Sequence, residues 1–501
     1  MTPAPRPLPA DALREVREAS RKQARAMSGI GVALLGAAGV ALTMLVVIVL
    51  DYRFHQPFHR VAKLLGAGAL GVGVLLMPWI GMLAFPVVVP YLPWIPPVPV
   101  PGMNALNLLL GSVFCSWAVS RVMKGGTLTR PSRIGGSLAV LLALVALGIV
   151  RGAAFPSGAE YDAFKATVAA VRVLAEFSVF YIAYYMVRGE KARRQLVWAI
   201  LLGLALECVT TIMLGRTGKG GRAVGSIGQS NELGTFMAMY AVLAAAMIPA
   251  VKNVLGKLVL GALVVAGGFG VILSLSRAGM IAILVGLFYV GVRSSKLLTA
   301  MLLLTLLTSP IWAPDYLKDR ITGTTVEADD SDEAELDNAS QMRVSTWQAL
   351  FRVIGDHPID GVGFNALPTV LPQSGAALGV DVMDSSHNSF LRMQGELGIF
   401  GLAVFAWVLW SCWSLAGATL RAARSRFDRQ LAVGLGAAAL ALMISCGFGD
   451  RFFNIMITGG FWVLCALAED ILHETRQPAA AARPRDRVTG RAARPTAGAA
   501  S

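Results

Sequence analysis

Residues 255–293 read LGKLVLGALVVAGGFGVILSLSRAGMIAILVGLFYVGVR, two apolar runs separated by a single arginine, Arg277. Each run approaches the roughly 20 residues that a helix needs to cross a hydrocarbon core of about 30 Å. Because a charged side chain is costly in hydrocarbon, Arg277 is expected at the aqueous end of both helices, with almost no loop between them. The stretch therefore predicts two consecutive transmembrane helices.

Similar apolar stretches recur from Ser28 to Leu472. Of the 501 residues, 55% are hydrophobic and only 15% are charged, where a soluble domain carries about 25% charged residues. This composition excludes an ordinary soluble enzyme and predicts an all-α polytopic membrane protein with 12–14 transmembrane helices. The expected spans are 28–50, 62–120 (two or three helices), 135–152, 166–187, 195–214, 232–251, 255–276, 279–293, 297–313, 389–415, 430–447 and 452–474.

The net charge of +14 comes from basic clusters between the apolar segments rather than along one face. Such clusters mark cytoplasmic loops by the positive-inside rule, so the charge predicts topology and no nucleic-acid partner. Fourteen spans, the preferred count, would put both basic termini in the cytoplasm. The same parity puts the loop 215–231, the junction at Arg277 and the segment 314–388 on the opposite side of the membrane.

The expected parts of the chain follow from these spans. They are a cytoplasmic basic N-terminus (1–27), a transmembrane bundle (28–313), a large periplasmic loop (314–388), C-terminal transmembrane helices (389–474) and a disordered cytoplasmic tail (475–501). A loop of this size is typical of lids and binding elements. We expect it to begin with an acidic mobile stretch between Glu327 and Asp337 and to continue as an amphipathic helix at the membrane interface, over 345–354.

Three segments partly resemble motifs that bind nucleotides, calcium or zinc, but each lacks residues that its motif requires. In GRTGKGGRAVGS, Lys219 is followed by glycine rather than by serine or threonine, so a phosphate loop is excluded. The acidic stretch lacks the glycine and terminal glutamate of a calcium loop. His55 and His59 have no glutamate between them in the HExxH position. We therefore expect neither a metal site nor a cofactor.

Three ionisable side chains at the ends of apolar spans remain as candidates. They are Arg222, Arg277 and His387, and parity places all three on one side of the membrane. Each has a simpler interpretation, because an arginine at a span end often anchors in the interface and a histidine beside Ser386 and Asn388 can merely accompany a helix cap. Together they suit a phosphate-bearing lipid, since guanidinium groups bind phosphate oxygens and histidine accepts a proton near neutral pH.

Four segments, in this order, resemble the bacterial O-antigen ligase and O-antigen polymerase superfamily. They are GRAVGSIGQSNELGTFMAMY (221–240), SLSRAG (274–279), RVSTWQALFRVIGDHPIDGVGFNAL (343–367) and SSHNSFLRMQGELGIFGL (385–402). The resemblance covers roughly residues 200 to 450. It implies a metal-independent glycosyltransferase of the GT-C kind in the bacterial inner membrane, whose donor is a glycan on undecaprenyl pyrophosphate at the periplasmic face.

By motif, the resemblance implies that Arg222 and Arg277 hold the pyrophosphate and that His387 acts as the catalytic base. Arg172, Gln229, Arg343 and Asp450 are further candidates. Arg172 could equally pair with a carboxylate such as Glu176, and Asp450 could orient the histidine or cap a span.

Members of the superfamily differ in the acceptor, the molecule to which they transfer the glycan. Seven acidic residues between 327 and 337 disfavour an anionic acceptor, although salt screens such repulsion beyond about 8–10 Å. This favours a growing glycan as acceptor, hence a polysaccharide polymerase, for which a chain-length regulator protein is a candidate partner. A ligase onto lipid A core and a protein-glycosylating transferase stay as alternatives. A transporter is the alternative of another class, but the two halves show no internal repeat.

Overall fold

The computed structural model describes residues 77–95, 105–123, 130–155, 160–218, 221–294 and 338–481, two strands at 325–328 and 331–336, and single positions between 296 and 311. Its helices before the large loop are α3 (Pro78–Val88), η1 (Val89–Trp94), α4 (Ala105–Met123), α5 (Gly135–Ala154), α6 (Ala163–Met186), α7 (Gly189–Leu214), α8 (Ser230–Met247), η3 (Ile248–Ala250), α9 (Val254–Ser274) and α10 (Arg277–Ser294). Then follow β1 (Thr325–Ala328), β2 (Ser331–Leu336), α13 (Asn338–Asp356), α14 (Leu367–Leu378), α15 (Ser389–Ala422), α16 (Arg426–Cys446) and α17 (Ile455–Ala481).

Nine helices within the described residues are long and apolar enough to cross a membrane: α5 to α10 and α15 to α17, with η3 continuing α8. The prediction of an all-α polytopic membrane protein is thereby confirmed, and each of the nine corresponds to a predicted span. The predicted spans at 28–50 and 297–313, and the first part of 62–120, lie outside the described residues apart from a few single positions. The proline-rich run that begins at Pro86 forms the end of α3 and, up to Trp94, the 3-10 helix η1, whereas its part at 96–102 lies outside the described residues.

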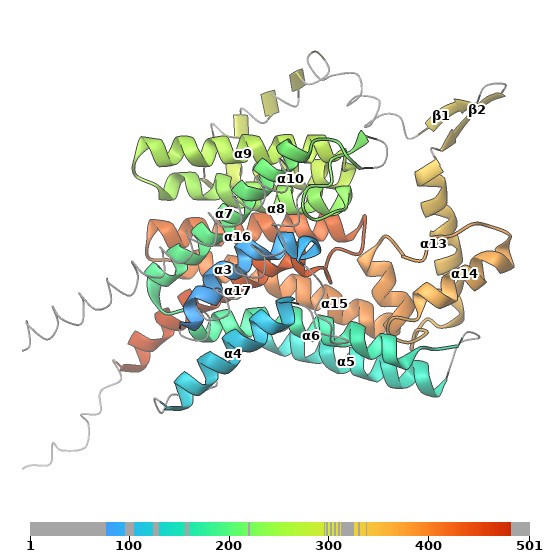
Figure 1. Ribbon diagram of the computed structural model, residues 1–501, viewed down its shortest axis with the longest axis horizontal. Coiled ribbons are helices and arrows are strands. Elements are labelled where there is room, and N and C mark those ends of the chain that lie inside the picture. Colours follow the sequence, from blue (N-terminus) through green and yellow to red (C-terminus); the bar gives the residue numbers. More distant parts are fainter. Residues whose placement is uncertain are drawn as a thin grey trace, which may run out of the picture.

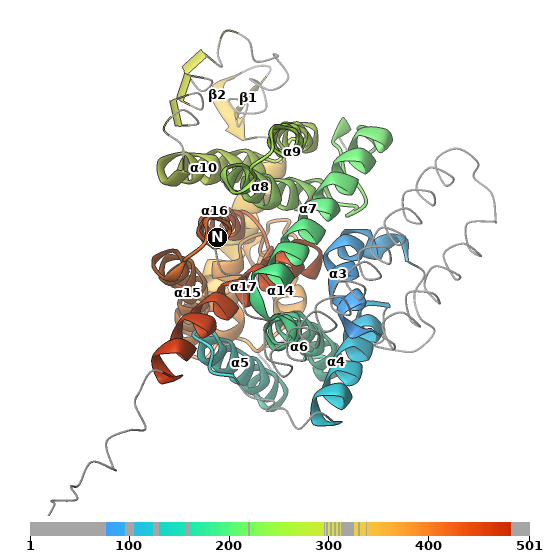
Figure 2. The same cartoon turned by 90° about the vertical axis from the view of Figure 1, so that its left-hand side faces the viewer.

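The bundle is built around α8 and α17. Figure 2, in which the helices are seen nearly end-on, shows α17 in the middle of the bundle. It packs against α6, α7, α15 and α16, whereas α8 packs against α9, α10 and α16. Small residues allow the close contacts: a Cβ on Gly279 of α10 would lie 2.9 Å from the backbone of Gly234 in α8.

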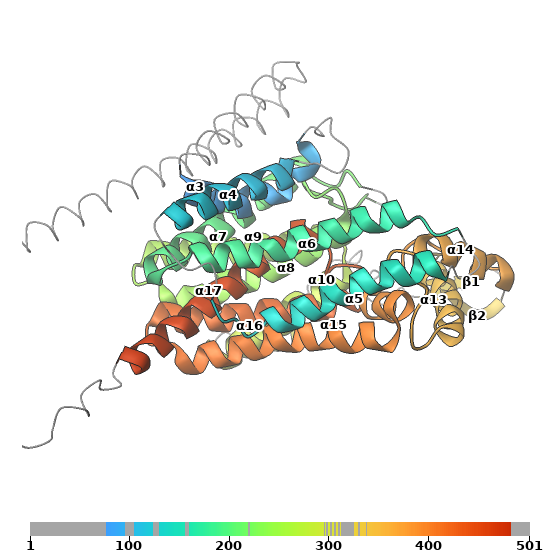
Figure 3. The ribbon, with the colours of Figure 1, turned by 90° about the horizontal axis from the view of Figure 1, so that it is seen from below.

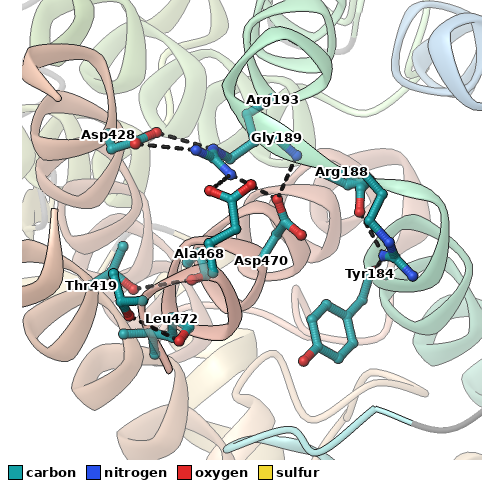
Figure 4. A network of polar contacts seen from close by, with 12 residues as sticks. Tyr184, Arg188, Gly189, Arg193, Thr419, Asp428, Ala468, Asp470 and Leu472 are labelled. Carbon is teal, nitrogen blue, oxygen red and sulfur yellow. Dashed lines mark hydrogen bonds and ion pairs between the residues drawn. The ribbon is translucent and has the colours of Figure 1, made fainter. Parts of the chain in front are cut away.

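One end of the bundle is held by a buried ion network. Arg193 in α7 is 2% exposed and donates to Asp428 of α16 at 3.0 Å and to Asp470 of α17 at 2.7 Å, and it also contacts Glu474 (Figure 4). Asp470 receives a second guanidinium, from Arg130, at 3.1 Å. A buried charge needs such partners to offset its desolvation. The network thus fixes α7, α16 and α17 to one another at the end where α7 begins.

The large loop folds into a small domain beyond the opposite end of the bundle, as Figures 1 and 3 show for α13 and α14. Its own core cluster includes Leu350 and Val353 of α13 and Leu367 and Leu371 of α14. The expected helix over 345–354 therefore exists, but it is longer. Its apolar side packs against α14, and its position at the membrane interface stays a prediction.

Two further segments differ from the predicted secondary structure or bounds. The acidic stretch between Glu327 and Asp337, for which the sequence predicted no strand, contains β2 and the end of β1, which pair as antiparallel strands; its mobility stays a prediction. At the C-terminus, α17 continues to Ala481, beyond the predicted start of the disordered tail at residue 475. Residues 482–501 lie outside the described residues.

A break in α15 receives the loop domain. Gly398 has φ +66°, which interrupts the helix, and the segment 358–363 binds there. The amides of Val362 and Gly363 donate to the carbonyls of Gly395 and Glu396 at 2.9 and 3.0 Å. A Cβ on Gly398 would lie 1.9 Å from a backbone oxygen, so only glycine fits. The sequences GVGF (361–364) and GELG (395–398) lie in the segments 343–367 and 385–402 that carry the resemblance. Their backbone contacts dock the loop domain onto α15.

Candidate functional site

Arg222 lies in the turn between α7 and α8, at the end of the bundle that carries the loop domain. Its Nε donates to the carbonyl of Ser274 at 2.9 Å and its Nη2 to Asn231 Oδ1 at 2.7 Å. The neighbouring Ala223 amide donates to the Leu273 carbonyl at 2.9 Å. These contacts fasten the turn to the end of α9 and set the direction of the half-buried guanidinium.

A carboxyl group inside the bundle supports the same turn. Glu207 of α7 is fully buried and accepts from the Ser226 amide at 2.9 Å and from the Ser226 hydroxyl. Gly225 has φ +57°, and a Cβ there would lie 2.1 Å from Glu207 Oε1, so glycine lets the turn close onto the carboxyl. Glu207 was not among the predicted site residues, because it lies within an apolar span and outside the four segments that carry the resemblance. An ionisable residue within an apolar span is itself a signal of function.

Arg277 is the first residue of α10 and lies next to the Arg222 turn. Ser274 and Ser276, on either side of Leu275, pack against Gly234 in the second turn of α8. The N-termini of α8 and α10 therefore lie together. Helix N-termini carry partial positive charge and free N–H groups. They add to the two guanidinium groups, so this corner of the bundle is suited to bind an anion.

His387 lies in a strained turn just before α15. Its φ of +49° is in the left-handed region, which few residues other than glycine occupy. The helix cap is Asn388, whose side chain accepts from the amides of Phe390 and Leu391 at 2.9 and 3.2 Å. His387 is therefore not needed to begin the helix. The cap itself is made by Asn388, as the simpler interpretation expected, so a role for His387 depends on the surroundings of its imidazole.

Asp450, in the connection between α16 and α17, anchors this turn. Its carboxylate accepts from the hydroxyl of Ser385 at 2.7 Å and from that of Ser386 at 3.0 Å. The Ser385 hydroxyl in turn receives the His387 amide at 3.4 Å, and the Trp347 indole of α13 donates to the Ser386 carbonyl at 3.0 Å. Asp450 thus holds the turn that carries His387 through the two preceding serines.

Arg451 joins the histidine turn to the arginine corner. Its guanidinium is buried and donates to Glu232 Oε1 at 3.2 Å and to Gln229 Oε1 at 3.3 Å, at the start of α8. Its amide lies 3.2 Å from the Ser389 hydroxyl, in the first turn of α15. One connection therefore holds both halves of the site. Arg451 was not among the residues predicted from the sequence, because Glu232 lies 219 positions away along the chain and leaves no local pattern.

Two cations act on the imidazole. Burial lowers the pKa of His387 below its ordinary value, and Arg343 and Arg451 lower it further. Asp450 and Asp384 oppose this effect by raising the pKa. Arg343 comes from the second turn of α13, so the loop domain contributes a charge to the histidine's surroundings. A histidine with a lowered pKa is neutral at pH 7, the form in which it can accept a proton.

The remaining candidates have separate places. Gln229 caps α8 by accepting from the Glu232 amide at 3.1 Å. Arg172 is exposed along α6, and no contact of the described residues links it to the other candidates. It forms no ion pair with Glu176, which is buried and lies 3.4 Å from the Thr458 hydroxyl of α17. Across the described ranges, no group of three or more His, Cys, Asp or Glu residues is arranged to hold a metal ion.

Fold and site together define a polytopic membrane protein with an arginine- and histidine-bearing site at one end of its helices. Residues 262–406 match the model of a protein family described as O-antigen ligase. The matched segment runs from α9 into α15 and includes Arg277, the loop domain and His387, whereas Arg222 precedes it. The match confirms the resemblance to the O-antigen ligase and polymerase superfamily and indicates an enzyme of that type. No curated protein matches the chain.

Proposed function

We propose that the protein transfers a glycan from undecaprenyl pyrophosphate to the hydroxyl of an acceptor sugar, without a metal ion, at the periplasmic face of the bacterial inner membrane. The observation that carries the proposal is the linkage of the Arg222 turn, through Arg451 and Asp450, to the turn of His387. Anion-binding groups and a proton acceptor thus belong to one connected polar end of the bundle.

The chemical step needs one base and a stabilised leaving group. His387 takes the proton of the acceptor hydroxyl while its oxygen forms a bond to the anomeric carbon of the donor. The bond from that carbon to the pyrophosphate oxygen breaks, and the pyrophosphate leaves with the polyprenyl chain. Arg222, Arg277 and the N-termini of α8 and α10 stabilise its growing negative charge. Such charge stabilisation takes the place of a divalent cation.

The acceptor we favour is another glycan, which makes the enzyme a polysaccharide polymerase. The chain carries seven acidic residues between 327 and 337, just before α13. These residues repel a phosphate-rich acceptor such as lipid A core. The repulsion acts over roughly 8–10 Å, because salt screens it at longer distances. The family description favours the second candidate, a ligase that transfers the finished glycan onto that core.

The test is incubation of the purified protein in lipid nanodiscs with undecaprenyl-pyrophosphate-linked repeat units, with and without EDTA. We expect a ladder of longer glycans in both reactions. A single transfer, and only after lipid A core is added, would instead identify a ligase. Activity that EDTA abolishes and Mg²⁺ or Mn²⁺ restores would overturn the metal-free step. Movement of the intact donor across the membrane without any transfer would indicate a transporter.

A further inference from the structure

The loop domain contains a cavity of about 200 Å³ between α13 and α14. Its floor is apolar and includes Val353 and Val362, which are 4% and 1% exposed, and the half-buried Val370. The floor is also rigid, because the Val362 amide donates to the Gly395 carbonyl at the break in α15. The apolar surface that reaches the opening is therefore small and comes mainly from the half-buried Val370 and the exposed Ala377.

The rim of the cavity is polar. Arg352 and Asp356 lie one turn apart on α13, and Gln373 faces them from α14; all three residues are exposed. Ser374 lines the same cavity, although its hydroxyl is already used by the Ala349 carbonyl at 3.0 Å. The rim thus offers planar donors and acceptors above an apolar floor.

This cavity is separate from the site of His387. Trp347 of α13 faces the histidine turn, since its indole donates to the Ser386 carbonyl. At about 3.6 residues per turn, the step from Trp347 to Asp356 is roughly two and a half turns, which puts Asp356 on the opposite side of α13. A ligand bound in the cavity would therefore be held by the loop domain and not by the catalytic groups.

The chemistry of the lining identifies the class of ligand. One arginine and one aspartate on the rim give it no net charge, and the Nδ1 atom of the neighbouring His357 is 3.2 Å from an Arg151 nitrogen. A pyrophosphate would find no excess of cations here. A sugar ring presents an apolar C–H face and a rim of hydroxyl groups, which matches this floor and rim. The volume is below the roughly 300–1,000 Å³ of drug-sized pockets and suits about one ring.

We propose that this cavity is a glycan subsite that holds one uncharged sugar of the growing chain at a distance from the point of transfer. The inference rests on the proposed polymerase function. A chain held there stays with the enzyme between successive transfers, so it is extended again before it dissociates. The subsite would then increase product length without taking part in the transfer step.

The first test compares product lengths from the variants Arg352→Ala and Gln373→Ala and their double mutant in the nanodisc reaction. We expect the double mutant to shorten the mean product at least twofold, while the rate of the first transfer stays within twofold of the wild type. Gln341→Ala is the matched control, because Gln341 is an exposed glutamine of α13 outside the cavity. It should leave the lengths unchanged. Unaltered lengths in the double mutant would overturn the proposal.

The second test measures binding without turnover. The probe is the oligosaccharide released from the lipid-linked donor by mild acid, and its contact with the protein is followed by saturation-transfer NMR. We expect the signal in wild type and Gln341→Ala, and at least a fivefold weaker signal in the double mutant. Equal signals in all proteins would exclude the subsite. A protein that binds the oligosaccharide at this cavity but transfers no glycan would retain the subsite and refute the proposed function.

Discussion

The guanidinium groups of Arg222 and Arg277 allow charge and geometry to be tested separately. Lysine keeps the positive charge but loses the planar fork, so it cannot reproduce the contacts of Arg222 with both Ser274 and Asn231. We expect Arg222→Lys and Arg277→Lys to lower the transfer rate by about 10- to 100-fold, the loss of a charge-assisted hydrogen bond of roughly 1.5–3 kcal/mol. Thermal unfolding in detergent should not change for Arg277→Lys, whereas Arg222→Lys should lower the unfolding temperature slightly, because it loses contacts that fasten the turn to α9.

The matched control is Arg216→Lys, an exposed arginine of the same turn whose guanidinium contacts the Gly221 carbonyl. Its transfer rate should stay near that of the wild type. If Arg216→Lys slowed transfer as much as the two test variants, the effect would come from the fold of the turn and not from pyrophosphate binding.

The imidazole of His387 sets the expected pH dependence. Burial first, and then Arg343 and Arg451, lower the pKa of this group below its ordinary value of 6.5, against the opposing effect of Asp450 and Asp384. A base is active when neutral, and the neutral fraction falls as the pH drops through the pKa. Transfer should therefore persist somewhat below pH 6.5 and decline at lower pH.

The variant Arg343→Gln tests the cause of this shift. It removes a cation that disfavours the protonated imidazole, so the pKa should rise and the acid limb of the pH–rate profile should move to higher pH. An acid limb that stays in place in Arg343→Gln would show that α13 does not act on His387.

The buried carboxyl of Glu207 is one of the groups that hold the turn between α7 and α8. Glu207→Ala leaves the Ser226 amide without its acceptor, a loss of about 1–3 kcal/mol for a buried hydrogen bond. We expect a roughly 10-fold higher KM for the lipid-linked donor, because Arg222 is then less well positioned. Glu207→Gln keeps an acceptor and should recover most of the affinity.

Thr210→Ala is the control for this pair. It removes a buried contact one turn away in α7, with the Tyr91 hydroxyl at 2.9 Å, but touches no residue of the turn. Its KM should match the wild type. A KM in Glu207→Ala equal to that of the control would assign Glu207 a purely structural role.

The helices themselves follow closely from the sequence, whereas the loop domain does not. Long apolar runs mark the nine described spans because a membrane demands about 20 apolar residues in succession. In α13 the apolar spacing predicts a helix but not its partner: Leu350 is buried against α14, whereas Phe351 is 56% exposed. The docking of Val362 onto the break at Gly398 depends on backbone geometry that no side-chain pattern encodes.

The candidate site was predictable only in part, because some of its contacts join residues that are far apart in the sequence. Arg222, Arg277 and His387 stand out as isolated charges at span ends. Arg451 and Glu232 form their ion pair across 219 positions of sequence, so only the packing of the whole bundle brings them together. The left-handed φ of His387 is likewise invisible in the sequence.

The stability of the whole bundle should depend on the ion network at its other end. Arg193→Met leaves Asp428 and Asp470 buried beside an apolar side chain. Breaking a buried pair in this way costs roughly 3–5 kcal/mol, so we expect a clear drop in the unfolding temperature in detergent. The neighbouring Arg194→Met removes an exposed pair with Glu190, worth about 0.3–0.5 kcal/mol, and a cation–π contact with Phe427, worth about 0.5–1 kcal/mol. Equal unfolding temperatures for the two variants would contradict this account.

In the proposed mechanism His387 performs the chemistry, whereas Arg222 and Arg277 bind the donor. The most direct measurement is the transfer rate of His387→Ala at saturating lipid-linked donor, with donor affinity determined on the same sample. We expect affinity within about twofold of the wild type and transfer slowed by roughly 10²–10⁴-fold, the usual contribution of a general base. A His387→Ala protein that extends glycans at the wild-type rate would contradict the mechanism.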